Sequence, residues 1–285
     1  MSAAQDYVFS FKCQDRPGII AAVSSCLFEA GCDIRDAAQY GDPDTGMFFV
    51  RIHLAAPQTL SVEQLQQALD GLITKFELDY KLHNLGQKLR SLIAVSKQDH
   101  CLNDLLHRWR SGLLHTDIVG VISNHEDLGN LTQWYGLPFY HLPLSADSKA
   151  AQEEQIIALM REQQVDLLVL ARYMQILSQN LCRQLEGRCI NIHHSFLPSF
   201  KGAKPYHRAH EHGVKLVGAT AHFVTTDLDE GPIIEQDVVR VNHTHSAQEM
   251  VNMGREVETR VLARAVRWYV EHRIHVNGQK TIVFE

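Results

Sequence analysis

Three side chains in the second half of the chain have the types that acyl chemistry requires. Asn191 and His193 stand two residues apart in an apolar segment, and Asp229 follows farther along. An Asn amide can donate a hydrogen bond to an oxygen that becomes negative in a tetrahedral intermediate. A His can carry a proton near neutral pH, and a carboxylate can hold its tautomer and position a water. The residue types alone also allow a structural alternative, with a turn-capping Asn, a buried His and a turn Asp.

Histidine is the residue type in excess. The chain contains 17 histidines, and eight of them lie between residues 193 and 245. His207, His210 and His212 form an H-x-x-H-x-H pattern, which together with a nearby acid could ligate zinc. In a helix, however, positions 207 and 210 share a face and position 212 lies off it. Lys204 and Arg208 are unfavourable neighbours for a cation, so we expect no metal here. A zinc-dependent hydrolase is the less favoured alternative.

The elements that position these residues predict an α/β domain. Near-continuous apolar runs, typical of strands covered on both faces, alternate with helical patterns. The runs are residues 92–96, 117–123 and 165–171, and the helical patterns are residues 102–110 and 150–164. The alternation predicts a doubly wound, Rossmann-like parallel sheet. Ligands bind beyond the carboxyl ends of such strands, where a short strand would deliver Asn191 and His193 on one face.

Further elements are expected after this point. The pattern predicts strands at residues 219–224 and after the turn at 226–234, then a long amphipathic helix over 251–273 and a short terminal strand.

The first part of the chain has a different pattern. Alternating apolar residues predict four strands, and two amphipathic patterns predict helices between them. The strands are residues 7–13, 33–39, 47–54 and 78–82, and the helices are residues 19–29 and 61–76. The order β-α-β-β-α-β fits an α+β ferredoxin-like sandwich. A break at residues 84–88 divides the chain into domains 1–85 and 86–285.

The composition excludes several classes of protein. The chain has 285 residues, of which 45% are hydrophobic and 21% charged, as expected for two globular domains. A net charge of −6 gives no general footprint for nucleic acid. No apolar run approaches the roughly 18 residues of a membrane span, and the N-terminus lacks a secretory pattern. Six cysteines without C-x-x-C pairing indicate reduced thiols of a cytoplasmic protein.

Two longer strings change the interpretation of the three polar residues. N-I-H-x-S-x-L-P begins at Asn191, and L-D-x-G-P-I-I begins at Leu228. Together they resemble the folate-dependent formyltransferase fold family, over roughly residues 89–273. The resemblance implies that Asn191, His193 and Asp229 are the catalytic trio. It also implies that the strand-end segment 171–178 binds the pterin and that Leu228 closes the other side of the pocket. The predicted pterin contacts in that segment are Met174, Gln175, Ile176 and Leu177.

Two departures from the family pattern favour a hydrolytic member. The glycinamide ribonucleotide transformylases have a Gly-rich loop for the substrate phosphate, whereas residues 96–103 contain no glycine and include Asp99. The members that formylate methionyl-tRNA carry a basic C-terminal domain, whereas this chain is acidic and ends shortly after its closing helix.

The N-terminal module points the same way. The turn Asp15-Arg16-Pro17-Gly18-Ile19 within β-α-β-β-α-β resembles that of an ACT domain, an amino-acid-sensing module. The resemblance implies an effector such as glycine or methionine near Asp15, Pro17 and Gly18, and a homo-oligomer joined through the sheet edges.

An ACT-like module ahead of a formyltransferase-like domain is typical of family members that hydrolyse 10-formyltetrahydrofolate. The resemblance therefore implies release of formate and tetrahydrofolate, with water as co-substrate and no separate cofactor. This reaction would feed formate to purine synthesis and balance the one-carbon folate pool. The alternatives are a formyltransferase with an amine acceptor, the zinc hydrolase, and an amino-acid-responsive regulator with a degenerate catalytic domain.

Three other histidines are candidates for supporting positions. His194 follows the catalytic candidate directly, and His222 lies on the next predicted strand. His100 occupies the region of the missing phosphate loop. We expect His194 to line the pocket or pack behind the strand, His222 to lie in the core or behind the site, and His100 to face the water.

Overall fold

A computed structural model describes residues 4–144, 149–195 and 205–285, which form two compact units. The first unit comprises Met1–Lys88, His272–His275 and Ile282–Glu285, and the second comprises Leu89–Glu271 and Val276–Thr281. The predicted boundary at residue 85 falls slightly before this division, and the prediction placed all the C-terminal residues in the second domain.

Residues 272–275 belong to the first unit because they contact residues that are distant in the sequence. Arg51 Nε donates to the His272 carbonyl at 3.2 Å, and the rings of His83 and His272 stack with centroids 3.6 Å apart. No local pattern in the sequence signals such pairing.

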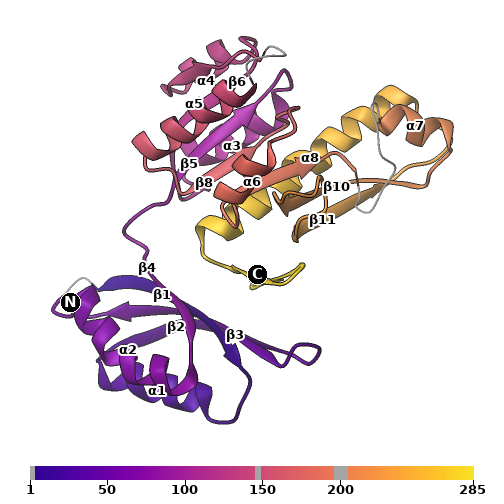
Figure 1. Cartoon of the computed structure of the whole chain (residues 1–285). Helices are drawn as coiled ribbons and strands as arrows, with labels where there is room; N and C mark the ends of the chain where they lie inside the picture. Colours follow the sequence, from indigo (N-terminus) through magenta and orange to yellow (C-terminus); the bar gives the residue numbers. More distant parts are fainter. Residues whose placement is uncertain (1–3, 145–148, 196–204) are drawn as a thin grey trace. The chain divides into compact units, whose positions relative to one another are not determined.

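The first unit is an antiparallel sheet with two helices packed on one face (Figure 1). Its strands follow the spatial order β2-β3-β1-β4, and its core contains Phe9, Phe11 and Leu69. The elements are β1 (Gln5–Gln14), α1 (Ile19–Glu29), β2 (Asp33–Asp42), β3 (Met47–Ala56), α2 (Val62–Phe76) and β4 (Asp79–Asn84). This order confirms the predicted ferredoxin-like sandwich.

Local chemistry explains where the two helices of this unit begin. Gly18 precedes α1 with a φ of 93°, a left-handed conformation that glycine adopts without a steric penalty. Ser61 and Gln64 form a capping box at the start of α2, since each side chain accepts from the backbone N–H of the other.

The second unit is built on a seven-stranded sheet. The spatial order is β11-β10-β9-β8-β5-β6-β7, and the strands from β7 to β9 are parallel. The strands are β5 (Arg90–Val95), β6 (Asp117–Ser123), β7 (Phe139–His141), β8 (Leu167–Leu170), β9 (Cys189–His193), β10 (Leu216–Phe223) and β11 (Ile233–Arg240). The helices are α3 (His100–Arg110), α4 (Gly129–Trp134), α5 (Lys149–Glu162), α6 (Gln179–Gln184), α7 (Pro205–Glu211) and α8 (Ala247–Val270).

This architecture confirms the predicted fold class and adds detail at one edge of the sheet. β10 runs antiparallel to β9, and β11 runs antiparallel to β10. β10 and β11 follow each other directly in the chain, as an antiparallel pair allows, whereas a parallel pair needs a crossover connection. The short elements β7, α4, α6 and α7 have no counterpart in the sequence-based expectation.

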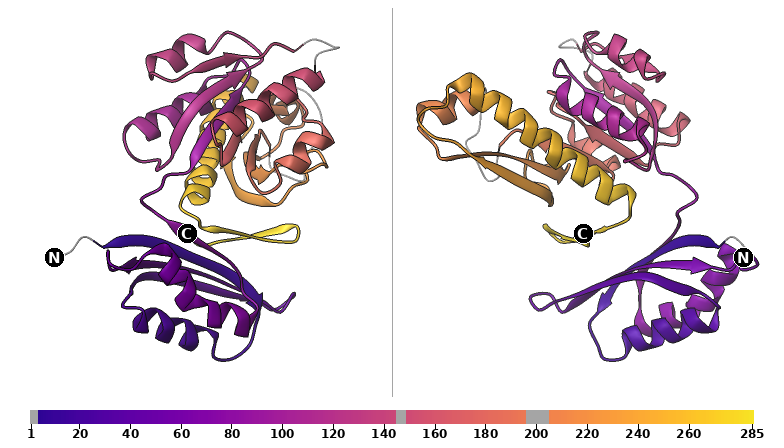
Figure 2. Two further views of the ribbon diagram at one scale, coloured as in Figure 1. Left: turned by 60° about the vertical axis from the view of Figure 1, so that its left-hand side comes forward. Right: turned by 180° about the vertical axis from the view of Figure 1, so that it is seen from behind.

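Helix α8 closes the second unit along β10 and β11 (Figure 2). It begins four residues before the predicted start, because Ser246 and Glu249 form a capping box, and it ends at Val270. Two short strands, β12 (Ile274–Asn277) and β13 (Lys280–Val283), pair with each other where a single strand was expected. Within the described ranges, no helix is long and apolar enough to cross a membrane.

Candidate active site

The ends of three neighbouring strands bring the first site residues together. Leu170 of β8 pairs in parallel with Asn191 of β9, and Asn191 pairs in antiparallel register with His222 of β10. The Asn191 amide nitrogen lies 3.2 Å from His222 Nε2. His222 Nδ1 lies 2.8 Å from the Phe223 carbonyl, which can only accept, so Nδ1 donates there. In the neutral ring, Nε2 is then free to accept from Asn191, which orients the amide.

Asp229 reaches the same place from the loop between β10 and β11. Its backbone is left-handed, with a φ of 58°, a conformation that is uncommon outside glycine. Gly231 fixes the loop against the strand, because a Cβ at this position would lie 1.8 Å from the Phe223 carbonyl oxygen. Asp229 Oδ1 lies 3.3 Å from His193 Nδ1 and 3.7 Å from His222 Nε2. The predicted trio therefore meets in space.

The surroundings of Asp229 favour the ionised form of its carboxyl group. Burial by itself would raise the pKa of Asp229, but interactions with the nearby His193 and His222 rings outweigh burial and hold that pKa well below its usual range. Asp229 is therefore charged at neutral pH. A carboxylate at this distance from His193 Nδ1 can accept a hydrogen bond from the ring and hold its tautomer.

His194 lies beside the trio and remains neutral. Its ring stacks on that of His193 with centroids 5.0 Å apart and an interplanar angle of 25°. Burial, reinforced by the positive charges of Arg172 and His193, lowers the pKa of His194 to about 4. His194 and His222 both line the cavity described next, so two of the three candidate supporting histidines lie at the site.

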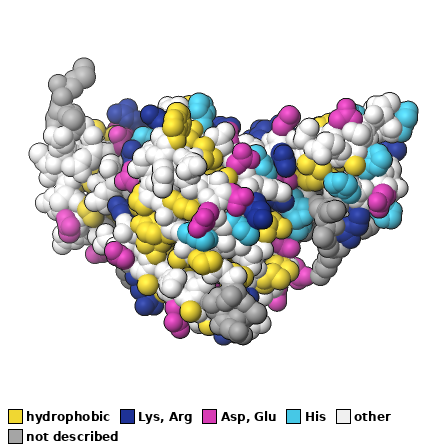
Figure 3. Space-filling model, turned by 90° about the horizontal axis from the view of Figure 1, so that it is seen from above, with side chains coloured by type: hydrophobic (Ala, Val, Ile, Leu, Met, Phe, Trp, Pro, Cys, Tyr) yellow, Lys and Arg dark blue, Asp and Glu magenta, His cyan; other side chains and the backbone are white. Residues whose placement is uncertain are grey.

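A cavity of about 420 Å³ adjoins the trio. All five residues predicted to hold the substrate line it, and they are Met174, Gln175, Ile176, Leu177 and Leu228. Three of these apolar side chains are far from buried, with exposed fractions of 55% for Met174, 60% for Ile176 and 58% for Leu228. Figure 3 shows histidine side chains beside hydrophobic side chains on one face of the molecule. Exposed apolar side chains around a concave site are typical of ligand-binding pockets.

The wall of this cavity is attached to the neighbouring strands. The backbone N–H of Met174 donates to Ser96 Oγ at 3.0 Å, and Ser96 Oγ donates to Asn124 Oδ1 at 2.7 Å. Leu197 and Pro198, which belong to the N-I-H-x-S-x-L-P string, lie outside the described residues.

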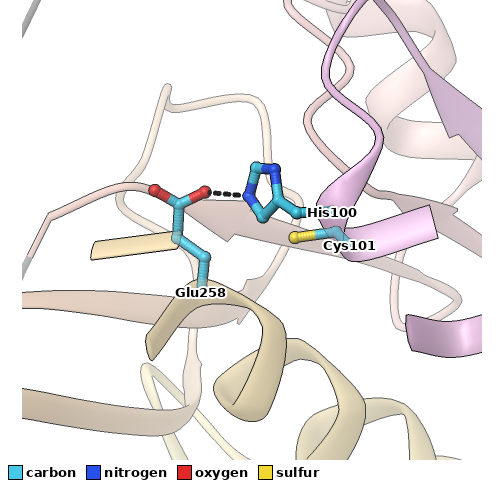
Figure 4. Close-up of side chains that lie close together, drawn as sticks. All are labelled: His100, Cys101 and Glu258. Carbon is cyan, nitrogen blue, oxygen red and sulfur yellow. Dashed lines mark hydrogen bonds and ion pairs between the residues drawn. The ribbon is translucent and has the colours of Figure 1, made fainter. Parts of the chain in front are cut away.

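His100 does not line the cavity, in contrast to the expectation that it faces the water of the site. Its Nε2 lies 2.8 Å from Glu258 Oε2, and both side chains are largely buried (Figure 4). Glu258 also accepts from the Tyr206 hydroxyl at 2.7 Å, and Arg172 Nε lies 3.4 Å away. The sequence predicted no role for Glu258 or Tyr206, and it placed Arg172 in the pterin-binding segment 171–178 without a role of its own. One signal was available, because Glu258 lies on the apolar face of α8 together with Val261 and Leu262.

The Glu258 group has the residue types of a metal site but the wrong charge balance. Ligand atoms of His100, Cys101 and Glu258 lie within 4.8 Å of one another. Burial, with the negative charge of Glu258 as a second cause, raises the pKa of Cys101 well above its usual range, so the sulfur stays a thiol. Glu258 is already balanced by Arg172 and His100, which leaves no excess negative charge for a cation.

The other metal hypothesis concerned the H-x-x-H-x-H pattern. His207 and His210 lie in α7, and His212 follows it. In the part of the chain that the structure describes, the group of possible ligands brought together is the His100 group and not these three. Lys204 lies outside the described residues.

The predicted effector residues lie in the first unit. Asp15, Pro17 and Gly18 are exposed in the turn between β1 and α1. The backbone N–H of Asp15 donates to the Gly46 carbonyl at 2.8 Å, which holds this turn next to the β2–β3 hairpin. An effector role for these residues stays a prediction.

Both units match known protein families. A family model for formyl transferases matches residues 89–266, and a model for the ACT domain matches residues 7–71. The chain is 46% identical to the formyltetrahydrofolate deformylase of Corynebacterium sp. (strain P-1), over 99% of both chains. It is 47% identical to the formyltetrahydrofolate deformylase of Bacillus subtilis (strain 168), over 95% of this chain and 91% of that relative.

Solved structures agree with these matches. The crystal structure of formyltetrahydrofolate deformylase from Burkholderia mallei is similar with a TM-score of 0.94 at 46% identity, over 99% of this chain and 100% of that one. Glycinamide ribonucleotide transformylase 1 from Symbiobacterium toebii is similar with a TM-score of 0.65 at 28% identity, over 73% of this chain and 97% of that one. Since relatives named for one activity match both units along almost their whole length, the chain belongs to the formyltetrahydrofolate deformylase family.

Proposed function

We propose that this protein hydrolyses 10-formyltetrahydrofolate to formate and tetrahydrofolate, with Asn191, His193 and Asp229 as the catalytic residues. The observation that carries the proposal is the convergence of these three side chains at one cavity, in a chain of this family. The reaction would supply formate for purine synthesis and regulate the one-carbon folate pool.

The cavity suits the flat, largely apolar pterin ring next to a polar reaction centre. Met174, Ile176 and Leu228 present exposed apolar side chains, and the backbone and side chain of Gln175 add polar groups. Ligand pockets commonly combine an apolar lining with a few polar groups that fix orientation. We assign these residues to the pterin and the trio to the formyl group on N10.

In the first step, a water held by Asp229 attacks the formyl carbon. A C–O bond forms, the carbonyl electron pair moves to oxygen, and the proton lost by the water passes to the Asp229–His193 pair. Asn191 and His193 donate hydrogen bonds to the resulting oxyanion. Asp229 suits the orienting role, because its pKa lies well below its usual range and the carboxylate stays charged.

In the second step, the tetrahedral adduct collapses. The C=O bond forms again, and the C–N10 bond breaks with its electron pair going to nitrogen. N10 takes the proton stored on the pair, which gives tetrahydrofolate. The released formic acid ionises to formate, so one proton reaches the solvent for each water consumed.

Purified full-length protein given 10-formyltetrahydrofolate should release formate and tetrahydrofolate in equal amounts. Loss of one oxyanion donor lowers kcat by a factor of about 10²–10³, so kcat of the Asn191→Ala variant should fall by that factor. Formyl transfer to an added amine in place of formate release would contradict the proposal. Loss of activity on exhaustive chelation, restored by zinc, would favour the metal-dependent alternative.

A second proposal concerns the first unit. We infer that its ACT domain binds a small amino acid such as glycine or methionine near Asp15, Pro17 and Gly18, and that the chain forms a homo-oligomer in the cytoplasm. The exposed turn and the exposed edge strand β2 support this. Rates measured with and without each amino acid, together with the mass from light scattering, test both parts. Unchanged rates or a monomeric mass would contradict them.

A further inference from the structure

Arg172 lines the cavity, and the proposed hydrolysis leaves it without a task. It follows β8 two residues after Leu170, which pairs with Asn191, and it lines the cavity with Asn191 and His193. Its φ of 66° is left-handed. In a residue with a side chain this conformation is strained and persists only where the surroundings impose it, commonly at functional sites.

The guanidinium of Arg172 is buried but only partly bonded. The side chain is 8% exposed. Its Nε donates to Gln98 Oε1 at 2.9 Å and lies 3.4 Å from Glu258 Oε2. Its Nη1 is buried and has no hydrogen-bond partner within the described part of the chain. An unpaired buried donor is unfavourable, so this atom indicates a ligand that accepts a hydrogen bond.

The surroundings hold Arg172 as a fixed cation. Burial by itself would raise the pKa of Glu258, but the His100 hydrogen bond and the charge of Arg172 outweigh it and lower that pKa, so Glu258 is ionised. On the cavity side, His194 is neutral, because burial and the charge of Arg172 lower its pKa to about 4. Nη1 of Arg172 is therefore a cationic donor without a partner in the described part of the chain, near an uncharged ring, and this arrangement suits an anion.

We propose that Nη1 of Arg172 forms a subsite for a small carboxylate, which formate occupies after the C–N10 bond breaks. A planar carboxylate with two acceptor oxygens matches the N–H groups of a guanidinium. The formyl group of the substrate is neutral and offers one acceptor oxygen. The subsite therefore binds the product more tightly than the substrate and holds formate while tetrahydrofolate is still bound. This inference rests on the hydrolysis proposed above.

Formate inhibition of hydrolysis tests the subsite in the full-length enzyme. Arg172→Lys keeps the charge beside Glu258 but lacks the guanidinium fork, and Arg161→Met is a control on the exposed face of α5. In Arg172→Lys, the inhibition constant of formate should rise at least about tenfold, while KM for 10-formyltetrahydrofolate changes by less than about threefold. In Arg161→Met, both constants should match the wild type.

A direct binding measurement separates this inference from the hydrolysis itself. Sodium formate should raise the unfolding temperature of the wild-type enzyme with tetrahydrofolate bound, and sodium chloride at equal ionic strength should not. Arg172→Lys and the charge-neutral double variant Arg172→Met/Glu258→Met should lose this shift. The double variant leaves no carboxylate unpaired at Glu258, which guards against simple unfolding.

Three results would overturn the subsite. They are a formate shift that survives in both variants, no shift in the wild type, and a fall in kcat for Arg172→Lys with an unchanged formate constant. The last result would place Arg172 at the transition state instead. If the enzyme releases no formate from 10-formyltetrahydrofolate, the proposed function fails, and the formate shift still decides whether the subsite exists.

Discussion

The second unit contains two histidine–carboxylate pairs in opposite settings, one at the cavity and one in the interior. His193 and Asp229 lie 3.3 Å apart at the cavity, with side chains 16% and 27% exposed. His100 and Glu258 lie 2.8 Å apart in the interior, where Glu258 is 1% exposed. Tyr206 and Arg172 occupy further positions around the Glu258 carboxylate. In the described part of the chain, Asp229 pairs with two histidines, His193 and His222, and it lines the cavity.

Access to the cavity, and not residue type, separates a reacting pair from a structural one. A carboxylate whose oxygens are filled by protein donors has none left for water or substrate. A carboxylate held by histidines at a cavity can bind water and exchange protons with the adjacent ring. Changes at the cavity pair, His193 and Asp229, should therefore reduce the rate of hydrolysis. Changes at the buried pair, His100 and Glu258, should reduce stability.

The largest expected effect is on the rate of hydrolysis, at the cavity pair. Asp229→Asn removes the carboxylate that holds water and accepts a hydrogen bond from His193, so kcat should fall by about 10²–10⁴. The urea midpoint at neutral pH should also fall, because Asn cannot make the stabilising interactions that lower the pKa of Asp229. Asp127→Asn, an exposed change outside the cavity, is the control. Near wild-type formate release by Asp229→Asn would remove Asp229 from the mechanism.

The buried pair should respond through stability. Glu258→Leu leaves Arg172 and His100 without their carboxylate, and removing one partner of a buried ion pair costs about 3–5 kcal/mol of unfolding free energy. Urea denaturation measures this loss. Arg172→Met/Glu258→Met should lose less than Glu258→Leu alone, because no buried charge remains unpaired. A Glu258→Leu variant of wild-type stability would show that the cluster is not a closed ion pair.

A smaller loss is expected where α8 meets the same cluster. A Cβ at Gly254 would lie 2.1 Å from Cζ of Tyr206, so Gly254→Ala must displace the ring that donates to Glu258. Overpacking of this kind costs about 1–3 kcal/mol in unfolding free energy. Gly71→Ala in α2 is the matched control, since its Cβ meets nothing within 4 Å. The control should gain about 0.5–1 kcal/mol from helix propensity. Equal effects of the two changes would contradict the close contact.

A further effect should be a pH dependence of stability from His194, which acts only at acidic pH. Its pKa falls from the usual 6.5 to about 4 on folding, so the folded ring is neutral where the unfolded ring takes up a proton. Stability should therefore be lost as the pH falls from 6.5 towards 4, at no more than about 1.4 kcal/mol per pH unit. Urea unfolding at several pH values should show a shallower slope for His194→Gln. An unchanged slope would exclude this ring as a source.

Asp229 should act in the same sense as His194, but at lower pH. Its pKa is lowered on folding, so its contribution to stability is present above its usual value of 3.8 and is lost as the pH falls through the folded pKa. The two groups therefore lose their contributions in successive pH ranges.

Much of the fold could be predicted because its signals are local. Hydrophobic period and turn residues placed the strands and helices of the first unit close to their observed bounds. The same patterns missed the short elements β7, α4, α6 and α7, which contain too few residues to show a period. They also assigned residues 272–275 to the second domain. Local patterns could not show otherwise, because the contact between Arg51 and His272 joins positions far apart in the chain.

The sequence by itself determined the types and order of the reacting residues, since strand period sets Asn191 and His193 on one face and the loop string carries Asp229. Only the tertiary structure decided which carboxylate each histidine meets. His100 and Glu258 are separated by 158 positions, and their pairing depends on α3 packing against α8. A charged residue on an apolar helix face predicts that a buried partner exists. Its identity requires the packed fold, because partners are chosen by proximity in space and not by spacing along the chain.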